Sequence, residues 1–454
     1  MLAWLAAAVA VCAAETAAPI RLLTLDPGHF HAALFQKEML PEVAERVHVY
    51  APLGPDLTAQ LNRIAQFNSR KENPTRWQLE IHAGPDFLER MLAERPGNVV
   101  VLSGNNRGKI DRIDAIVRHG LHVLADKPWV IEPEEMPQLQ SALDTAEEKG
   151  VAAYDAMTQR FEISCILPRE LVNNAEIFGT CMNGSSSEPA VIMESVHYLL
   201  KEVAGVPSLR PAWFFDVRQQ GEGLADVGTH LVDLVQWTLF PDQAIDYRRD
   251  ITVLRGSHWP TVLSLAQFQR VTGEKNFPDC VQEAVHGGAL NYFANNSVTY
   301  SLRGVFVRLD IKWDFEPPPG AKDTEFATFR GTRSRIEVRQ GQEEQFVPEV
   351  YVVPNGPALK EPVQTALARH IASLQKSTPG LAVQEQAGRF RVVIPDRCRA
   401  GHEAHFALLT RQFLDFVRNP KTVPAWEKPN MLAKYFVTTQ GVKLARETSE
   451  KQKH

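Results

Sequence analysis

Between residues 19 and 155 the chain alternates short apolar segments with longer amphipathic ones, and this alternation constrains the fold more than any other feature. The segments expected to be strands are Arg21–Leu25, Arg46–Tyr50, Val99–Leu102, Leu121–Ala125 and Val151–Tyr154, and those expected to be helices are His29–Leu40, Leu57–Phe67, Ile110–His119 and Met136–Lys149. Strand–helix alternation with continuous β-branched runs is typical of a parallel sheet covered on both faces. We therefore predict a doubly wound α/β domain of the Rossmann type over residues 19–155.

The remainder of the chain is richer in strands. Helices are expected at Ser164–Asn174, Leu224–Leu239, Ala404–Val417 and Pro429–Glu447, and strands at Val191–His197, Ser297–Phe315, Glu325–Arg330 and Ser334–Val338. Alternation with period two favours a sheet with one covered face. Because 454 residues exceed one ordinary core, we predict a second domain over residues 156–454.

The N-terminus carries an apolar, alanine-rich run, Leu2–Ala14, followed by Glu15–Pro19. This run is too short to span a bilayer but suits the core of a signal peptide over residues 1–18, although no Lys or Arg precedes it. We therefore expect an exported protein, periplasmic or secreted. The alternatives are an alanine-rich extension or a lipid anchor at Cys12.

Composition narrows the class of partner. With 49 Lys and Arg against 54 Asp and Glu and no basic block, nucleic acid is not an expected partner.

The cysteines that follow the predicted signal peptide are scattered without a CxxC pair, which favours buried thiols over disulfides. They are Cys165, Cys181, Cys280 and Cys398.

The strand at Leu121–Ala125 ends in Asp126, Lys127 and Pro128. Pro128 cannot continue a central strand and favours an extended conformation at Lys127. In open α/β sheets the carboxyl ends of strands line the ligand crevice. A lysine there can be desolvated enough to exchange a proton. The alternative is a solvent-facing lysine at a strand end.

A second candidate group begins the helix predicted at Leu224–Leu239. Asp226 and His230 are four residues apart, so they share a face of one helix, and Gly221 and Gly223 make its entry flexible. A carboxylate one turn from an imidazole can hold that ring in one tautomer and keep it basic. The alternative is a capped helix start with a packed His230.

The turn after the first strand departs from the dinucleotide fingerprint G-x-G-x-x-G. Its sequence is Asp26-Pro27-Gly28-His29-Phe30-His31, with one glycine. Pro27 lacks a backbone donor, and Asp26 adds negative charge where a pyrophosphate is expected. Helix amides from His29 onward, together with protonated His29 or His31, can still bind an anion. Packing and helix capping are the alternative roles of these histidines.

The other two loops of the expected nucleotide site are also informative. Ala51 and Pro52 follow the second strand where an acid usually binds the ribose hydroxyls, and the first acid is Asp56. The polar loop after Val99–Leu102 contains Ser103 and Asn105, which we expect to contact a nucleotide or sugar. An ordinary solvated loop is the alternative.

In the second domain, His197 ends a strand, and the segment from Trp213 to Arg218 sets aromatic rings beside charged groups. Aromatic faces with a few hydrogen-bonding groups suit a carbohydrate or polyol. The predicted substrate residues are His197, Trp213, Asp216 and Arg218; core aromatics with a surface ion pair are the alternative. His402-Glu403-Ala404-His405 lacks the spacing of the zinc-protease motif, so no metal is assigned.

Taken in order, these motifs resemble the Gfo/Idh/MocA oxidoreductase family over nearly all of the chain beyond residue 19. Asp126-Lys127-Pro128 is similar to the family's Glu-Lys-Pro motif, the segment 221–230 to its glycine-rich turn with Asp and His, and Gln159-Arg160-Phe161 to its Arg-Phe pair at the domain junction. The segments 26–31 and 211–218 resemble an exported branch that carries a "putative oxidoreductase C-terminal" domain.

The resemblance implies a nicotinamide-dependent oxidoreductase that acts on a CH–OH group of a sugar, polyol or glycoside, with NAD or NADP tightly held. It implies that Lys127 and His230 handle the hydroxyl proton while Asp226 orients them. The residues that would bind the cofactor are Gly28, His29, His31, Ser103, Asn105, Asp126, Lys127 and Pro128. The resemblance also implies that the second domain is an α+β domain with an open, mostly antiparallel sheet. Copies of the chain are expected to associate through the open sheet.

Two other functions stay open. The first is a glycoside-cleaving enzyme that oxidises, eliminates and re-reduces on one bound cofactor, because free NAD is scarce outside the cytoplasm. The second is a catalytically silent sugar-binding protein that has lost the cofactor, which the altered glycine turn favours.

Overall fold

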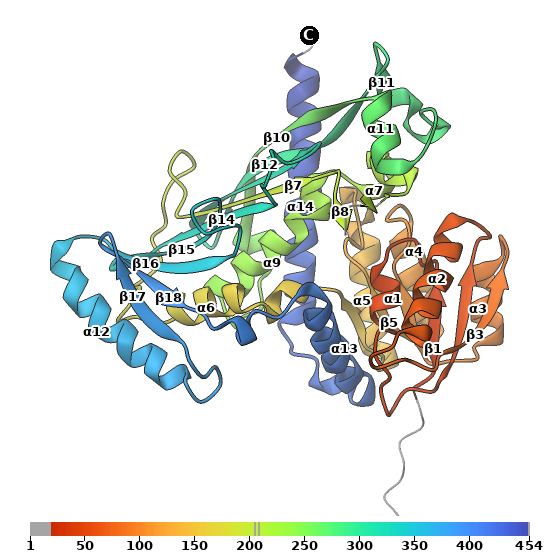
Figure 1. The fold of residues 1–454 in the computed structure, drawn as a ribbon, viewed down its shortest axis with the longest axis horizontal. Coiled ribbons are helices and arrows are strands. Elements are labelled where there is room, and N and C mark those ends of the chain that lie inside the picture. The colour runs from red at the N-terminus through yellow and green to blue at the C-terminus, as the bar shows by residue number, and fades with distance from the viewer. Residues whose placement is uncertain (1–19, 204–205, 208, 453–454) are drawn as a thin grey trace, which may run out of the picture.

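The computed structural model describes residues 20–203, 206–207 and 209–452 (Figure 1). The predicted signal peptide, with Cys12, lies outside the described residues. Among the helices of the described ranges, none combines the length and the apolar character that crossing a membrane requires.

Six parallel strands form the first sheet, in the order β3-β2-β1-β4-β5-β6. They are β1 (Leu22–Leu25), β2 (Arg46–Ala51), β3 (Gln78–Ala83), β4 (Val99–Leu102), β5 (His122–Ala125) and β6 (Ala153–Asp155), and the helices between them are α1 (His31–Leu34), α2 (Pro55–Ser69), α3 (Phe87–Glu94), α4 (Lys109–Arg118), η1 (Pro133–Glu135) and α5 (Met136–Lys149). This strand order is that of a doubly wound dinucleotide-binding sheet, with its switch point between β1 and β4. The predicted Rossmann-type fold is confirmed.

Both faces of this sheet are covered, and one helix comes from the far end of the chain. Helices α1, α2 and α13 (His402–Arg418) cover one face, where Phe406, Leu409 and Phe413 of α13 join the core. Helices α3, α4 and α5 cover the other face. The four residues of β4 are buried on both sides, as their unbroken apolar run predicts.

The predictions for this domain fail at two places. The helix predicted at His29–Leu40 ends at Leu34. The Trp77 indole donates to the Gln36 carbonyl at 2.6 Å and takes the acceptor that the Leu40 amide would use. Arg70 donates at 2.6 Å to the Lys37 carbonyl, which has no helical donor because residue 41 is proline. Strand β3 and helix α3 were not predicted, because β3 lies at the sheet edge and none of its side chains is fully buried.

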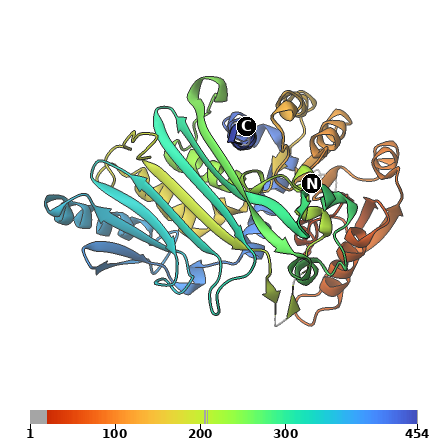
Figure 2. The same ribbon diagram turned by 90° about the horizontal axis from the view of Figure 1, so that it is seen from above.

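The second sheet is mixed and open, with strand order β10-β12-β13-β7-β14-β15-β16-β18-β17 and β11 paired to β12 (Figure 2). Its strands are β7 (Val191–Tyr198), β10 (Ile251–Ser264), β11 (Val285–His286), β12 (Ala289–Leu302), β13 (Val305–Asp314), β14 (Thr324–Arg330), β15 (Ser334–Gln340), β16 (Glu349–Pro354), β17 (Ala382–Gln386) and β18 (Arg389–Val393), while β8 (Glu202–Val203) and β9 (Val206–Pro207) pair separately. Within the described sheet, β7 and β13 are parallel and the other pairs antiparallel. The predicted α+β domain is confirmed.

The segment predicted as strand-rich over Ser297–Phe315 forms two strands, because the chain turns at Arg303 and Gly304, both with positive φ. The helical elements of this part are η2 (Thr158–Phe161), α6 (Ile163–Val172), η3 (Ala212–Phe215), α7 (Val217–Gln220), α8 (Gly223–Asp226), α9 (Gly228–Leu239), α10 (Tyr247–Asp250), α11 (Leu265–Thr272), η4 (Asp279–Ala284), α12 (Pro357–Leu374), η5 (Asp396–Cys398), η6 (Pro420–Thr422) and α14 (Glu427–Gln452).

Helix α14 stands between the two domains and belongs to both cores (Figure 1). Met431, Leu432 and Tyr435 pack with the first domain, whereas Ala433 and Val437 pack with the second. Residues at positions i and i+1 of a helix point to different faces, so one helix can serve two cores.

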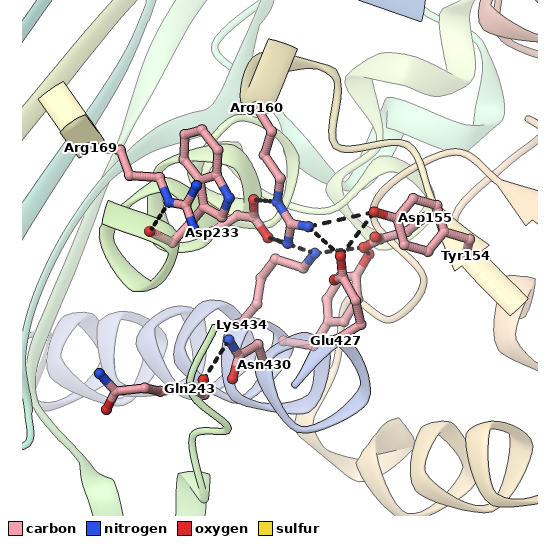
Figure 3. A network of polar contacts seen from close by, with 11 residues as sticks. Tyr154, Asp155, Arg160, Arg169, Asp233, Gln243, Glu427, Asn430 and Lys434 are labelled. Carbon is pink, nitrogen blue, oxygen red and sulfur yellow. Dashed lines mark hydrogen bonds and ion pairs between the residues drawn. The ribbon is translucent and has the colours of Figure 1, made fainter. Parts of the chain in front are cut away.

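Buried charges join the domains beside this helix (Figure 3). Arg160 of η2 donates twice to Asp233 of α9, at 2.7 Å each, and once to Glu427 of α14 at 2.6 Å. Lys434 donates to Asp155 of β6 at 2.7 Å and lies 3.3 Å from Asp233. The predicted place of Arg160 at the domain junction is thus observed, and three elements distant in sequence are held together by paired charges.

Removing Arg160 is expected to cost far more stability than removing a surface arginine. Arg160→Leu leaves the buried Glu427 carboxylate without a cation and Asp233 with Lys434 alone, so the free energy of unfolding should fall by about 3–5 kcal/mol. Arg76→Ala breaks an exposed pair with Glu45 and should cost about 0–1 kcal/mol. Urea unfolding measures both losses of unfolding free energy. Equal losses would show that the buried ion pairs of Arg160 do not stabilise the domain junction.

The junction is also expected to weaken in acid. Burial alone would raise the pKa of Asp233, but Arg160 and Lys434 outweigh it and lower that pKa to about 2. A lowered pKa stabilises the fold above the usual Asp value near 4, and this stability is lost as pH falls toward 2. The stability difference between the native protein and Asp233→Asn should therefore shrink by about 2 kcal/mol between pH 5 and pH 2. Asp415→Asn, at an exposed site, is the control; a pH-independent difference for Asp233→Asn would contradict the assignment.

Candidate active site

Lys127 and Asp226 meet across the domain boundary. Lys127, directly after β5, donates through Nζ to Asp226 Oδ1 at 2.5 Å and to the Asp226 carbonyl at 3.1 Å. Both side chains are largely buried, at 11% and 13% exposed. Burial alone would raise the pKa of Asp226, but the ammonium of Lys127 holds it below its ordinary value. The lysine is therefore a paired, desolvated group at the end of a strand and not a solvent-facing one.

Close packing of α8 on β12 fixes Asp226 in this position. A Cβ atom on Gly223 would lie 1.9 Å from the Ala294 carbonyl oxygen, so only glycine allows this approach. The amide of Leu224 donates to Asn296 Oδ1 at 2.8 Å and satisfies a donor at the start of the helix.

His230 lies near Asp226 in sequence but is not held by it. The predicted single helix is divided into α8 and α9 at Val227. Among the contacts of the described residues, no hydrogen bond or ion pair joins Asp226 to His230, and His230 Nδ1 has no hydrogen-bond partner there. Burial, followed by the charge of Lys127, lowers the pKa of His230 well below its usual range, so the ring is neutral.

The turn after β1 differs from the expected anion site. The His29 amide donates to the Ser103 carbonyl at 2.7 Å, so it is not free to bind an anion. Arg112 lies 3.0 Å from Asp26 and compensates its charge. A Cβ atom on Gly104 would lie 2.1 Å from the Asp26 carboxylate, so glycine is needed for the two loops to meet.

The two histidines of this turn face Asp126. His29 Nδ1 lies 2.9 Å from Asp126 Oδ2, and His31 Nδ1 lies 3.0 Å from Asp126 Oδ1. His31 Nε2 also lies 2.9 Å from His402 Nε2 of α13. Burial lowers the pKa of His31 to about 4, so this ring is neutral near pH 7 and does not act as the cationic anion holder that the sequence allowed.

An acid also stands beside the turn, as nucleotide recognition requires. Asp56, in the first turn of α2, comes within 3.2 Å of a Cβ built on Gly28 and accepts a hydrogen bond from the Trp213 indole at 3.1 Å. The Trp213 ring itself comes within 3.3 Å of the same point. Trp213, predicted to contact substrate, therefore lies over the glycine turn.

The loop after β4 is tied to the second domain. Asn105 donates to Gln219 of α7 at 2.5 Å, and Asn106 donates to the Gln220 carbonyl at 2.8 Å. Lys109, fully buried beneath this loop, donates to Asn106 Oδ1 at 2.6 Å and to the Asp126 carbonyl at 2.9 Å, and burial lowers its pKa to about 8. Sequence reasoning missed Lys109. Its signal was its place on the apolar stripe of α4, four residues before the buried Ile113.

His197 lies on β7 in a polar chain that the sequence did not reveal. Its Nε2 lies 2.8 Å from Ser195 Oγ and its Nδ1 3.0 Å from Asp323 Oδ2. Its ring centroid lies 4.8 Å from that of Trp313. Among the contacts of the described residues, none joins His197 to the Lys127–Asp226 pair.

Asp216 and Arg218 are not brought to that pair. Asp216 caps α7 by accepting from the Arg218 amide, and its carboxylate pairs with the Arg218 guanidinium at 3.0 Å. Arg218 also contacts Glu283 of η4 at 2.6 Å. These contacts match the surface ion pair that the sequence left open as the alternative.

The structure thus combines a Rossmann-type sheet with a lysine after β5 that is paired with an acid of the adjoining α+β domain. The family model described as "Putative oxidoreductase C terminal domain" matches residues 167–446, and the chain belongs to this family. The predicted relationship to oxidoreductases of the Gfo/Idh/MocA type is thereby confirmed. Comparison with curated proteins finds no match.

Solved structures share the whole fold. A "putative oxidoreductase" from Parabacteroides merdae is 41% identical over 95% of this chain and 98% of its own, with a TM-score of 0.93. GenD2 from gentamicin A biosynthesis, in complex with NAD, is 16% identical over 96% of each chain, with a TM-score of 0.56. KijD10, a 3-ketoreductase from Actinomadura kijaniata in complex with TDP-benzene and NADP, is 15% identical over 94% of this chain and 98% of its own, with a TM-score of 0.56.

The Lys127–Asp226 pair is expected to show strong coupling in a double-mutant cycle. Lys127→Ala leaves a buried carboxylate unpaired, so it should destabilise the protein, and adding Asp226→Asn should restore part of the loss. The coupling free energy should be about 1–3 kcal/mol, as measured by urea unfolding. The exposed Arg76–Glu45 pair serves as the control cycle, and a Lys127–Asp226 coupling no larger than that of this pair would contradict the geometry.

Proposed function

We propose that this protein is an exported NAD(P)-dependent oxidoreductase that transfers hydride from a CH–OH group of a sugar, polyol or glycoside. The observation that carries the proposal is the buried pair of Lys127 and Asp226 at the carboxyl end of β5. In doubly wound sheets this edge lines the ligand crevice.

Oxidation of an alcohol needs a group that takes the hydroxyl proton while hydride leaves carbon. Asp226 holds Lys127 Nζ in one place. The neutral ring of His230 is the group that can accept the hydroxyl proton. The two groups differ in charge, so the proton can pass to a neutral base while the ammonium stabilises the developing alkoxide. Asp226 positions Lys127. Among the described contacts, none joins Asp226 to His230.

The residues around the switch point fit a dinucleotide. Asp56 is placed beside Gly28, where a carboxylate binds ribose hydroxyls, although it follows β2 later in the chain than such acids usually do. Gly28, Ser103, Asn105 and Asp126 lie at the carboxyl ends of β1, β4 and β5 and would hold the cofactor, which supplies the hydride acceptor. The NAD and NADP complexes of GenD2 and KijD10 support this proposal.

The proposed substrate class rests on KijD10, a 3-ketoreductase, and on two partly exposed side chains, His197 and Trp213. An aromatic ring beside hydrogen-bonding groups suits a pyranose ring, whose C–H face stacks and whose hydroxyls donate and accept. The proposed export rests on the apolar N-terminal segment alone.

Nucleotide content and turnover test this function. Acid denaturation of the purified protein followed by mass spectrometry should release NAD(H) or NADP(H), or the added nucleotide should raise the melting temperature. Lys127→Ala should lose at least about 100-fold in turnover of a pyranoside, as expected when the group that stabilises the developing alkoxide is removed, while still binding nucleotide. Lys312→Ala, which removes a half-exposed lysine paired with Glu194, should keep full activity.

Each result has a defined meaning. If the purified protein releases no nucleotide and added NAD or NADP does not raise its melting temperature, the proposal is overturned and a sugar-binding protein is favoured. A fully active Lys127→Ala would show that the site is wrong. Turnover without net reduction of the nucleotide would replace the dehydrogenase with the glycoside-cleaving cycle.

A further inference from the structure

Three potential metal ligands converge beside the first turn of the Rossmann domain. His29 Nδ1, His31 Nδ1 and a carboxylate oxygen of Asp126 all lie within 4.8 Å of one another. Asp126 is 6% exposed and the His31 side chain 9%, whereas His29 is 37% exposed. The group is therefore buried on one side and open on the other.

The two histidines contact Asp126 at ion-pair distances of 2.9 and 3.0 Å. His29 Nδ1, His31 Nδ1 and Asp126 Oδ1 are nevertheless buried atoms without a well-aligned hydrogen bond among the described residues. Unpartnered buried polar atoms each cost about 1–3 kcal/mol, so three together at one point need an explanation.

A single cation explains all three atoms at once. Ligand atoms about 2.1 Å from one metal ion lie roughly 3.0–3.4 Å apart, for angles between 90° and tetrahedral. The two short separations end on different oxygens of Asp126: His29 Nδ1 lies 2.9 Å from Oδ2 and His31 Nδ1 lies 3.0 Å from Oδ1. An ion shared by both imidazoles would therefore be bound by both oxygens of this carboxylate.

A third histidine, His402, contacts the other ring nitrogen of His31. His402 Nε2 lies 2.9 Å from His31 Nε2, so one of the two rings donates a proton to the other. When His31 donates, its Nδ1 carries the lone pair that a metal requires. Metal-binding histidines ordinarily donate their second ring nitrogen in this way. Two ammonium groups lie nearby: Lys127 is paired with Asp226, and Lys109 donates to Asn106 Oδ1 and to the Asp126 carbonyl.

We propose that His29, His31 and Asp126 bind one divalent first-row transition metal ion, such as Zn²⁺, with an open coordination position toward the crevice. Two imidazoles and one carboxylate are the donor set of open sites for such ions, and the exposed side of His29 leaves room for a further ligand. From the sequence, only the segment His402–His405 was tested for a metal, and none was assigned. The proposed metal site shares Asp126 with the proposed cofactor site, and its test does not depend on turnover.

Metal binding is measured without turnover. A second group, His48, Glu80 and His82, lies on β2 and β3 and could also hold zinc, so all proteins carry His82→Ala. After removal of metals by a chelator, reloading with Zn²⁺ and desalting, plasma mass spectrometry should find one zinc per chain. His29→Gln and His31→Gln should each weaken zinc binding about tenfold or more, and the exposed His119→Gln should leave it unchanged.

Cobalt gives a readout that separates ligation from folding. The Co²⁺-loaded protein should show visible d–d absorption bands that disappear in His29→Gln, whose side chain is the most exposed of the three and whose fold circular dichroism can check. The proposal is overturned by a His82→Ala protein that binds no zinc, or by folded His29→Gln and His31→Gln proteins that bind it as tightly as their parent.

Discussion

The buried charges around Arg160 are the interaction on which the rest of the structure depends. Arg160, Asp233, Glu427 and Lys434 come from η2, α9 and α14, and Lys434 reaches Asp155 at the end of β6. Charges taken out of water are costly unless they are well paired. Here each partner is needed to compensate the others, so the elements can adopt one relative position. The active-site pair of Lys127 and Asp226 forms across the same boundary and needs that position.

The polarity of the crevice follows from the same arrangement. The first domain supplies Lys127, Lys109 and the imidazoles of His29 and His31, whereas the second supplies the Asp226 carboxylate. Asp26, which the sequence suggested would repel a phosphate, is compensated by Arg112. Charge that is unfavourable in the linear sequence is thus paired in the folded protein.

Much of the fold could be predicted because the spacing and length of apolar runs are local properties of the sequence. The unbroken apolar run of β4 and the abrupt end of β5 at Asp126, Lys127 and Pro128 identify a parallel sheet and its ligand edge without knowledge of distant residues. Edge strand β3 escaped prediction because its half-exposed residues have no clear period. Helix α1 was predicted too long because its end depends on Trp77, which lies some forty residues away.

Parts of the site could not be predicted because they depend on contacts between distant segments. Nothing in the sequence shows that Trp213 would reach Asp56, that His402 would face His31, or that His230 would be separated from the carboxylate four residues before it.

Helix α13 has a consequence for the order in which the chain can fold. Because Phe406, Leu409 and Phe413 complete the core of the N-terminal sheet, the second domain is in effect an insertion into the first. The first domain therefore cannot close its core during synthesis until nearly the whole chain has been made, and an N-terminal fragment ending at residue 155 would expose an apolar face instead of folding alone.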